Sequence, residues 1–194
     1  MSFEETLKKV VAALREADVP FLLAGSLAVW ARGGPETRHD LDFVVKEEDV
    51  ERAVEVLAEA GMEPEKPPEE WLWKARDGDV QVDLIFRPRG LEVTNEVIAR
   101  GELLHVLGIT IPVMSIEDVL ATKLLALHEH QLDFTGLVRI ARAVREQIDW
   151  GYLRERTAGS PYAAGFFTIC EELEIAPEVP APHGADVRLL TPRR

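Results

Sequence analysis

Two aspartates in one apolar segment constrain the fold of this chain more than any other feature. Asp40 and Asp42 belong to the run Asp40-Leu41-Asp42-Phe43-Val44-Val45, whose apolar and β-branched residues predict a strand. Side chains at i and i+2 of a strand share one face, so the two carboxylates lie together. They repel each other and lose hydration on folding unless a cation neutralises them. Mg²⁺ suits this role, because it prefers hard oxygen ligands and binds carboxylates together with substrate phosphates.

Thirteen residues separate a Gly-Ser pair from the first aspartate. Residues 20–24 predict a short buried strand, and Gly25 and Ser26 lead from it into a helix of residues 26–31, with Ser26 as the expected N-cap. A helix that begins after such a turn directs backbone N–H groups and the positive end of its dipole at one position. That position suits a triphosphate, so both residues are candidate phosphate ligands.

A third acid, Asp83, lies in the apolar run Val80-Gln81-Val82-Asp83-Leu84-Ile85-Phe86. The Asp-Gly dipeptide at residues 77–78 divides the segment 71–86 into two strands and predicts a hairpin. A third carboxylate is needed where two metal ions hold both an attacking oxygen and an α-phosphate. Asp83 would then be either the base that deprotonates an acceptor hydroxyl or a ligand of the first metal.

The order Gly25-Ser26, Asp40-Leu41-Asp42, Asp83 resembles the motif pattern of the DNA polymerase β-like nucleotidyltransferase superfamily. The resemblance implies an α+β fold, with a mixed sheet flanked by helices and a C-terminal helical part. It also implies the transfer of a nucleoside monophosphate from an NTP to a hydroxyl, with two Mg²⁺ ions and release of pyrophosphate. Asp40, Asp42 and Asp83 would be the catalytic and metal-binding residues.

The segment Ser115–Ala126 resembles the helix that opens the C-terminal part of AbiEii-like toxin nucleotidyltransferases. In those proteins a lysine on this helix faces the nucleotide, and Lys123 is the matching position. A second motif of the family begins at Asp133, but its further acid is replaced by Gly136, which leaves a catalytic role for Asp133 open. Arg38, just before the first aspartate, is a further candidate for nucleotide binding. This resemblance implies a tRNA 3′ end as acceptor and an antitoxin partner.

Other acceptors and roles stay open at this point. A small hydroxyl compound, as for antibiotic-modifying enzymes, or a protein side chain could replace tRNA. The fold could also serve as a weakly active module that binds a nucleotide or a partner. Lys123 has an ordinary alternative as a surface lysine whose apolar stem covers the core.

Composition sets broader limits. The 194 residues, 46% of them hydrophobic, suffice for a core, and we expect an α/β unit over residues 1–113, a helical subdomain over 114–176 and a loosely ordered tail over 177–194. No signal peptide and no apolar run of about 18 residues is present, so we expect a cytoplasmic protein without membrane contact. The net charge of −13 argues against broad nucleic-acid binding but allows a small local basic surface; it also favours basic partners such as an aminoglycoside.

The remaining pattern predicts the other elements. Helices are expected over residues 3–16, 48–60, 92–99, 115–126, 135–146, 150–156 and 162–173, and a strand pair over 103–113. The proline-rich residues 64–68 are expected to form a turn-rich connector.

Overall fold

The computed structural model describes residues 2–35 and 40–178, and its centre is one seven-stranded mixed sheet. The strand order is β3-β4-β5-β2-β1-β7-β6. The strands are β1 (Phe21–Leu23), β2 (Asp40–Val45), β3 (Glu63–Glu65), β4 (Leu72–Asp77), β5 (Val80–Ile85), β6 (Glu102–Val106) and β7 (Ile109–Val113). Strand β2 is parallel to β5 and antiparallel to β1, which in turn is parallel to β7. The predicted α+β class is confirmed.

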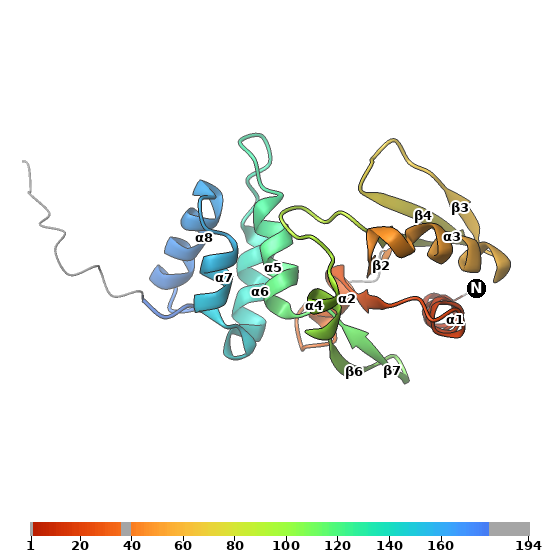
Figure 1. Ribbon diagram of the computed structural model, residues 1–194. Coiled ribbons are helices and arrows are strands. Elements are labelled where there is room, and N and C mark those ends of the chain that lie inside the picture. The colour runs from red at the N-terminus through yellow and green to blue at the C-terminus, as the bar shows by residue number, and fades with distance from the viewer. Residues whose placement is uncertain (1, 36–39, 179–194) are drawn as a thin grey trace, which may run out of the picture.

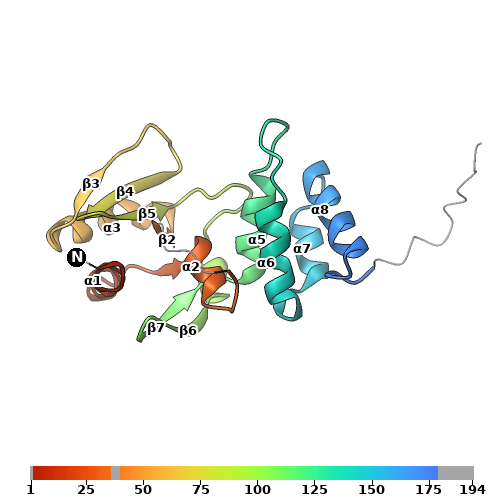
Figure 2. The same ribbon diagram turned by 180° about the vertical axis from the view of Figure 1, so that it is seen from behind.

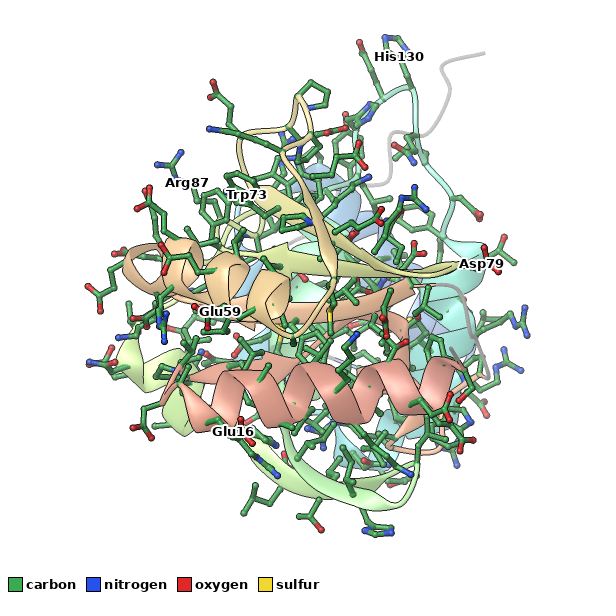
Figure 3. All side chains as sticks on the ribbon, turned by 90° about the vertical axis from the view of Figure 1, so that its right-hand side faces the viewer. Glu16, Glu59, Trp73, Asp79, Arg87 and His130 are labelled. Atoms are coloured by element: carbon green, nitrogen blue, oxygen red, sulfur yellow. The ribbon has the colours of Figure 1, made fainter. Side chains whose placement is uncertain are left out.

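Some of the α-helices pack against the sheet, and others form a group beyond its end. They are α1 (Phe3–Glu16), α2 (Gly25–Trp30), α3 (Val50–Glu59), α4 (Asn95–Ala99), α5 (Ile116–Leu125), α6 (Thr135–Val144), α7 (Trp150–Arg156) and α8 (Pro161–Glu172). Helices α1 and α3 pack together on one side, where α1 crosses the front of Figure 3 with α3 above it. Helices α5 to α8 gather at the other end of the molecule (Figures 1 and 2). None of the helices in the described parts is both long enough and apolar enough to cross a bilayer.

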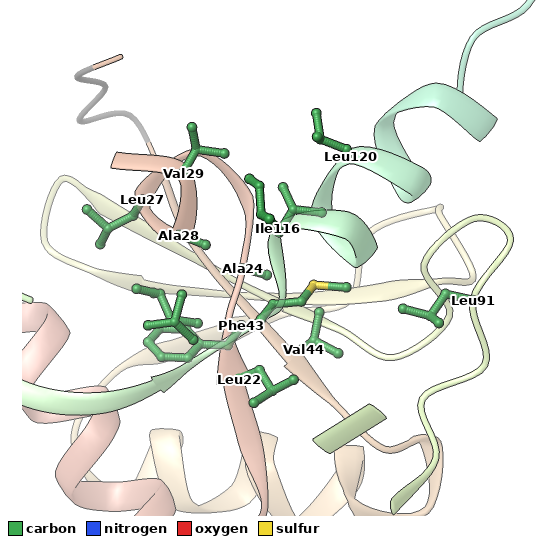
Figure 4. Close-up of a cluster of buried hydrophobic side chains, with 14 of the residues drawn as sticks. Leu22, Ala24, Leu27, Ala28, Val29, Phe43, Val44, Leu91, Ile116 and Leu120 are labelled. Atoms are coloured by element: carbon green, nitrogen blue, oxygen red, sulfur yellow. The ribbon is translucent and has the colours of Figure 1, made fainter. Parts of the chain in front are cut away.

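Strand β2 lies in the middle of the sheet, with its second half covered on both faces. Leu41, Phe43 and Val45 are fully buried on one face, and Val44 is buried on the other. Figure 4 shows Val44 close to Leu22, in a cluster that also receives side chains from the α5 helix. Asp40 and Asp42 share the face of Val44 but are only partly buried. The packing therefore fixes the strand while its acidic half stays accessible.

Two predicted details were wrong. Ser26 is not the N-cap, because α2 already begins at Gly25 after Ala24, and no side chain caps it. The proline-rich connector contains the edge strand β3, which pairs antiparallel with β4. All three residues of β3 are exposed. An edge strand tolerates proline because its outer N–H groups need no partner in the sheet.

Two predicted helices also differ in extent. The helix expected from residue 92 begins only at Asn95, where the hydroxyl of Thr94 accepts a hydrogen bond from the N–H of Val97. The helix expected from residue 48 opens with a 3-10 turn, Glu47–Asp49, before α3. Both differences concern helix ends, where local capping decides the boundary.

The end of β4 is tied to α1 through a buried carboxylate. Asp77 accepts hydrogen bonds from the hydroxyl of Thr6 at 2.8 Å and from Nζ of Lys9 at 2.7 Å. Burial alone would raise the pKa of Asp77, but these two bonds outweigh it and lower that pKa. The ion pair therefore contributes stability above the usual pKa of an aspartate and loses that contribution as the pH falls through the lowered value.

We expect Asp77→Ala to lower the free energy of unfolding by about 1.5–3 kcal/mol at pH 7, because two hydrogen bonds to a charged group are lost. Urea unfolding measures the change. The matched control is Asp79→Ala, an exposed acid in the turn of the same hairpin. Equal stability of the two variants, or a difference that does not shrink at acidic pH, would contradict this account.

Candidate active site

The sheet brings the three predicted acids to one face of two neighbouring strands. In the parallel pair of β2 and β5, Asp42 lies opposite Asp83, and Asp40 lies opposite Gln81. Residues in register on neighbouring strands are about 5 Å apart and point to the same side. Asp40, Asp42 and Asp83 are each partly buried. The predicted proximity of the acids is therefore present in the fold.

Asp42 carries the strongest electrostatic perturbation of the three. Its pKa is raised to about 6, first because the carboxylate is buried and next because Asp83 is nearby. The charge of Asp40 raises the pKa further, whereas the charge of Lys123 and a hydrogen bond from the backbone N–H of Ser26 lower it. A carboxylate with such surroundings gains from a nearby cation.

Asp83 has neighbours that the sequence analysis did not single out. Burial raises the pKa of Asp83, while a hydrogen bond from Nε2 of Gln81 at 2.9 Å and the charge of Lys74 oppose the rise. Lys74 lies opposite Asp83 in the β4–β5 pair, and Arg76 lies opposite Gln81. Side chains alternate along β4, so every second residue of this strand shares the face of Asp83 in the predicted hairpin. This alternation could have identified Lys74 and Arg76 from the sequence.

Gly25 lies directly against the carboxylate of Asp42. Its φ of +60° is in the left-handed region, which glycine adopts without steric cost. A Cβ atom at this position would lie 1.8 Å from Oδ2 and 2.9 Å from Cβ of Asp42. Glycine therefore suits this position for two reasons: its backbone conformation, and the lack of space for a side chain beside Asp42, a candidate metal ligand.

Lys123 contributes to the walls of two cavities. On one side it lines a cavity of about 130 Å³ together with Ser26 and Arg139. On the other side it lines a cavity of about 400 Å³ together with Trp71 and Ile85. Lys123 is partly buried and its charge acts on Asp42, so its position agrees with a role at the site rather than at a remote surface.

Arg38 and Asp133 are the remaining candidates from the sequence. Arg38 lies outside the described residues. Asp133 is exposed and accepts a hydrogen bond from the backbone N–H of Thr135 at 2.8 Å, which lowers its pKa and gives it a structural role at the start of α6.

The residues present suit a hard divalent cation. Carboxylates on adjacent strands, one of them with a raised pKa, are oxygen donors that Mg²⁺ would neutralise. Within residues 2–35 and 40–178, however, no group of three or more His, Cys, Asp or Glu side chains already surrounds a single position for a metal. The site thus offers ligands on a rigid sheet, without a preformed cage.

The mixed sheet flanked by helices, with further helices in the C-terminal part, agrees with a nucleotidyltransferase fold. The chain belongs to the family described as "Uncharacterised nucleotidyltransferase", which matches residues 1–166, and it is therefore an enzyme of this class. None of the curated proteins compared with the chain matches it.

Solved structures show the same fold. The crystal structure of ANT(2'')-Ia in complex with adenylyl-2''-tobramycin is 15% identical, with a TM-score of 0.61, over 86% of this chain and 97% of that one. The solution structure of the antibiotic-resistance factor ANT(2'')-Ia is 17% identical, with a TM-score of 0.60, over 88% of this chain and 94% of that one. At such low identity the likeness establishes the fold alone.

The contact between Gly25 and Asp42 leads to a prediction. We expect Gly25→Ala to displace the Asp42 carboxylate, to destabilise the protein by about 1–3 kcal/mol beyond the backbone cost, and to abolish any rise in melting temperature with Mg²⁺. Gly33→Ala is the matched control, since Gly33 also has a positive φ, +89°, but a Cβ there meets nothing within 4 Å. Thermal unfolding with and without Mg²⁺ measures both effects. Identical behaviour of the two variants would refute the steric role.

The raised pKa of Asp42 leads to a second prediction. Because the folded protein binds this proton more tightly than the unfolded chain does, the carboxylate destabilises the metal-free fold increasingly as the pH rises from about 4 to above 6. We expect Asp42→Asn to raise the free energy of unfolding by about 1–2 kcal/mol at pH 7 and to have little effect at pH 4. Denaturation at several pH values, with Asp79→Asn as control, measures the difference. A variant less stable than the unmodified protein at pH 7 would show that charge crowding is not dominant.

Proposed function

We propose that this enzyme transfers a nucleoside monophosphate from an NTP to a hydroxyl acceptor and releases pyrophosphate, with Mg²⁺ as cofactor. The observation that carries the proposal is the register of β2 and β5, which sets Asp42 opposite Asp83 while Gly25 lies against Asp42. This arrangement supports a site where acids, a metal and phosphates meet on one face of the sheet.

Asp40, Asp42 and Asp83 would hold the metal, and a pair of ions is the arrangement we infer for this transfer. When bound, Mg²⁺ would neutralise the phosphate charges and the carboxylate repulsion that raises the pKa of Asp42. Gln81 donates to one oxygen of Asp83 and thereby fixes the orientation of that carboxylate.

The remaining residues would bind the donor and move the proton. The backbone at Gly25 and Ser26 would hold the β- and γ-phosphates, and Lys123 would add a positive charge beside Asp42. The acceptor hydroxyl gives its proton to Asp83 as its oxygen forms a bond to the α-phosphorus. The bond from the α-phosphorus to the bridging oxygen breaks, and pyrophosphate leaves with that electron pair. Positioning and charge neutralisation account for the catalysis.

Two acceptor hypotheses follow from different observations. The segment Ser115–Ala126 supports a toxin-type enzyme that acts on tRNA and has an antitoxin partner, since it forms α5 with Lys123 beside the acids. The fold shared with ANT(2'')-Ia supports a small-molecule acceptor as much. A weakly active binding module is the third possibility, and it predicts NTP binding without release of pyrophosphate.

The test is a transfer assay. The protein is incubated with each α-³²P-labelled NTP, Mg²⁺ and total cellular RNA, and in parallel with small hydroxyl compounds that include tobramycin. We expect transfer that requires Mg²⁺, disappears with EDTA, and falls by more than about 100-fold in Asp40→Ala and Asp42→Asn, because each variant removes a metal ligand.

Asp79→Asn is the control for removing a negative charge from the same part of the sheet, because Asp79 lies exposed in the β4–β5 turn. It should transfer as fast as the unmodified protein. Undiminished transfer in Asp42→Asn would reject the proposed role of the acids. NTP binding with no pyrophosphate from any acceptor would favour the binding module.

A further inference from the structure

We propose that two residues of α6 complete the donor site: Arg139 binds the terminal phosphate of the NTP, and Gly136 leaves the space that this phosphate occupies. The inference rests on the proposed transfer reaction and adds the residues that make the enzyme prefer a nucleoside triphosphate to a diphosphate. It comes from the walls of the small cavity beside Ser26, from the size of that cavity and from the charges that face it.

Side chains and backbone from three helices line this cavity. The lining includes Ser26 and Val29 of α2, Lys123 of α5, and Gly136, Arg139 and Ile140 of α6. Helix α5 packs against both α2 and α6 (Figure 2). Gly136, Arg139 and Ile140 are spaced i, i+3 and i+4, so they share one face of α6. The C-terminal helices therefore supply a large part of the wall.

The cavity adjoins the acids through two of its lining residues. The backbone N–H of Ser26 donates a hydrogen bond to the carboxylate of Asp42, and the charge of Lys123 acts on the same carboxylate. A group bound in the cavity is therefore close to a proposed metal ligand. Since the α-phosphate reacts at the acids, the phosphate chain beyond it is the part of the donor that extends into this space.

The size of the cavity limits what it can hold. Its volume is about 130 Å³, whereas pockets that enclose a drug-sized molecule measure about 300 Å³ or more. A nucleoside is thus too large for it, while a phosphate group fits. The base and ribose of the donor must lie elsewhere.

The charges that face the cavity are positive. Lys123 and Arg139 line it, and no acidic side chain of the described residues does. Among residues 2–35 and 40–178, neither of these two cations has an acidic partner within ion-pair distance, although Arg145 on the same side of the molecule is paired with Glu146. An anion between Lys123 and Arg139 relieves their repulsion, and the planar guanidinium can donate to two phosphate oxygens at once.

Gly136 has no evident structural reason to be glycine. It lies in the first turn of α6, and a Cβ atom built on it meets nothing within 4 Å. Glycine is a poor helix former, so a larger residue would favour the helix. What glycine provides at this position is the open space of the cavity.

The experiment measures binding with donors that cannot react. Calorimetry gives the Kd of the α,β-methylene analogues of the four NTPs and of the corresponding NDPs, each with Mg²⁺. We expect the unmodified protein to bind the preferred NTP analogue more tightly than its NDP analogue. Arg139→Ala should raise the Kd of the NTP analogue by roughly 10- to 100-fold, the effect of losing hydrogen bonds from a charged group, and leave that of the NDP analogue unchanged. Arg139→Lys should restore part of the loss.

Gly136→Leu tests the space itself. The leucine side chain fills the cavity, so the preference for the NTP analogue should disappear while the NDP analogue binds as before. Because the site is open and leucine favours a helix, the melting temperature should not fall. Gly136→Ala is the matched control, since one methyl group leaves most of the space and should leave most of the preference.

Arg142→Ala is the control for charge. Arg142 is an exposed arginine on the same helix, but it does not line the cavity and its charge acts on Cys170 of α8. Its replacement should leave the Kd of both analogues unchanged. An equal loss in Arg142→Ala and Arg139→Ala would reduce the effect to the general charge of α6 and overturn the inference.

Two further results would overturn the inference. One is a preference for the NTP analogue that is absent from the unmodified protein or that survives in both Arg139→Ala and Gly136→Leu. The other is equal weakening of the NTP and NDP analogues in Arg139→Ala, because Arg139 would then contact a phosphate that both analogues share.

The inference and the proposed reaction can fail separately. Transfer from an NTP whose KM is unchanged in Arg139→Ala would reject the inference and keep the reaction. Absence of transfer to any acceptor, with a preference for the NTP analogue that depends on Arg139, would reject the reaction and keep the phosphate site.

Discussion

Crowded negative charge on two adjacent strands is the constraint on which the rest of this structure depends. Asp42 and Asp83 face the same side in register, and burial together with their mutual repulsion raises the pKa of Asp42 to about 6. Such an arrangement costs stability in the absence of a cation. Under the proposed function, the acids would bind the metal at the expense of the metal-free stability of the fold.

The surrounding fold holds this unfavourable group in place. The second half of β2 is buried on both faces, so the strand cannot move to separate the acids. Gly25 then approaches so closely that no larger residue fits beside Asp42, while the N–H of Ser26 donates to the same carboxylate. The backbone that would bind a phosphate thus also positions the carboxylate that would bind the metal. The turn at Gly25 and Ser26 and the strand β2 therefore determine the positions of both groups.

The sequence was sufficient for the strands and for the shared face of Asp40 and Asp42, since both follow from periodicity, and the family resemblance implied the fold class. Alternation along residues 40–45 and 80–85 gives two strands with acids on defined faces, and only their pairing had to be supplied by the fold. The sequence was insufficient where tertiary context decides. The edge strand β3 forms despite its proline because β4 offers a pairing partner. The N-cap of α2 is Ala24, and the N–H of Ser26 in the first turn donates to Asp42.

The neighbours of Asp83 illustrate the same limit within the site. Gln81, Lys74 and Arg76 were visible as residues of two strands, but their effect on Asp83 depends on the hairpin register, which places each of them on its face. Likewise, Lys123 could have been an ordinary surface lysine until α5 was seen to bring it beside Asp42.

The distribution of charge connects the site with the rest of the surface. With 22 basic and 35 acidic side chains, most of the molecule repels a polyanion at long range. Lys74 and Arg76 oppose this beside Asp83, and Lys123 opposes it near Asp42; at physiological salt such fields fade over about 8 Å. An anionic substrate such as an NTP is therefore attracted over a short range only, close to these cations.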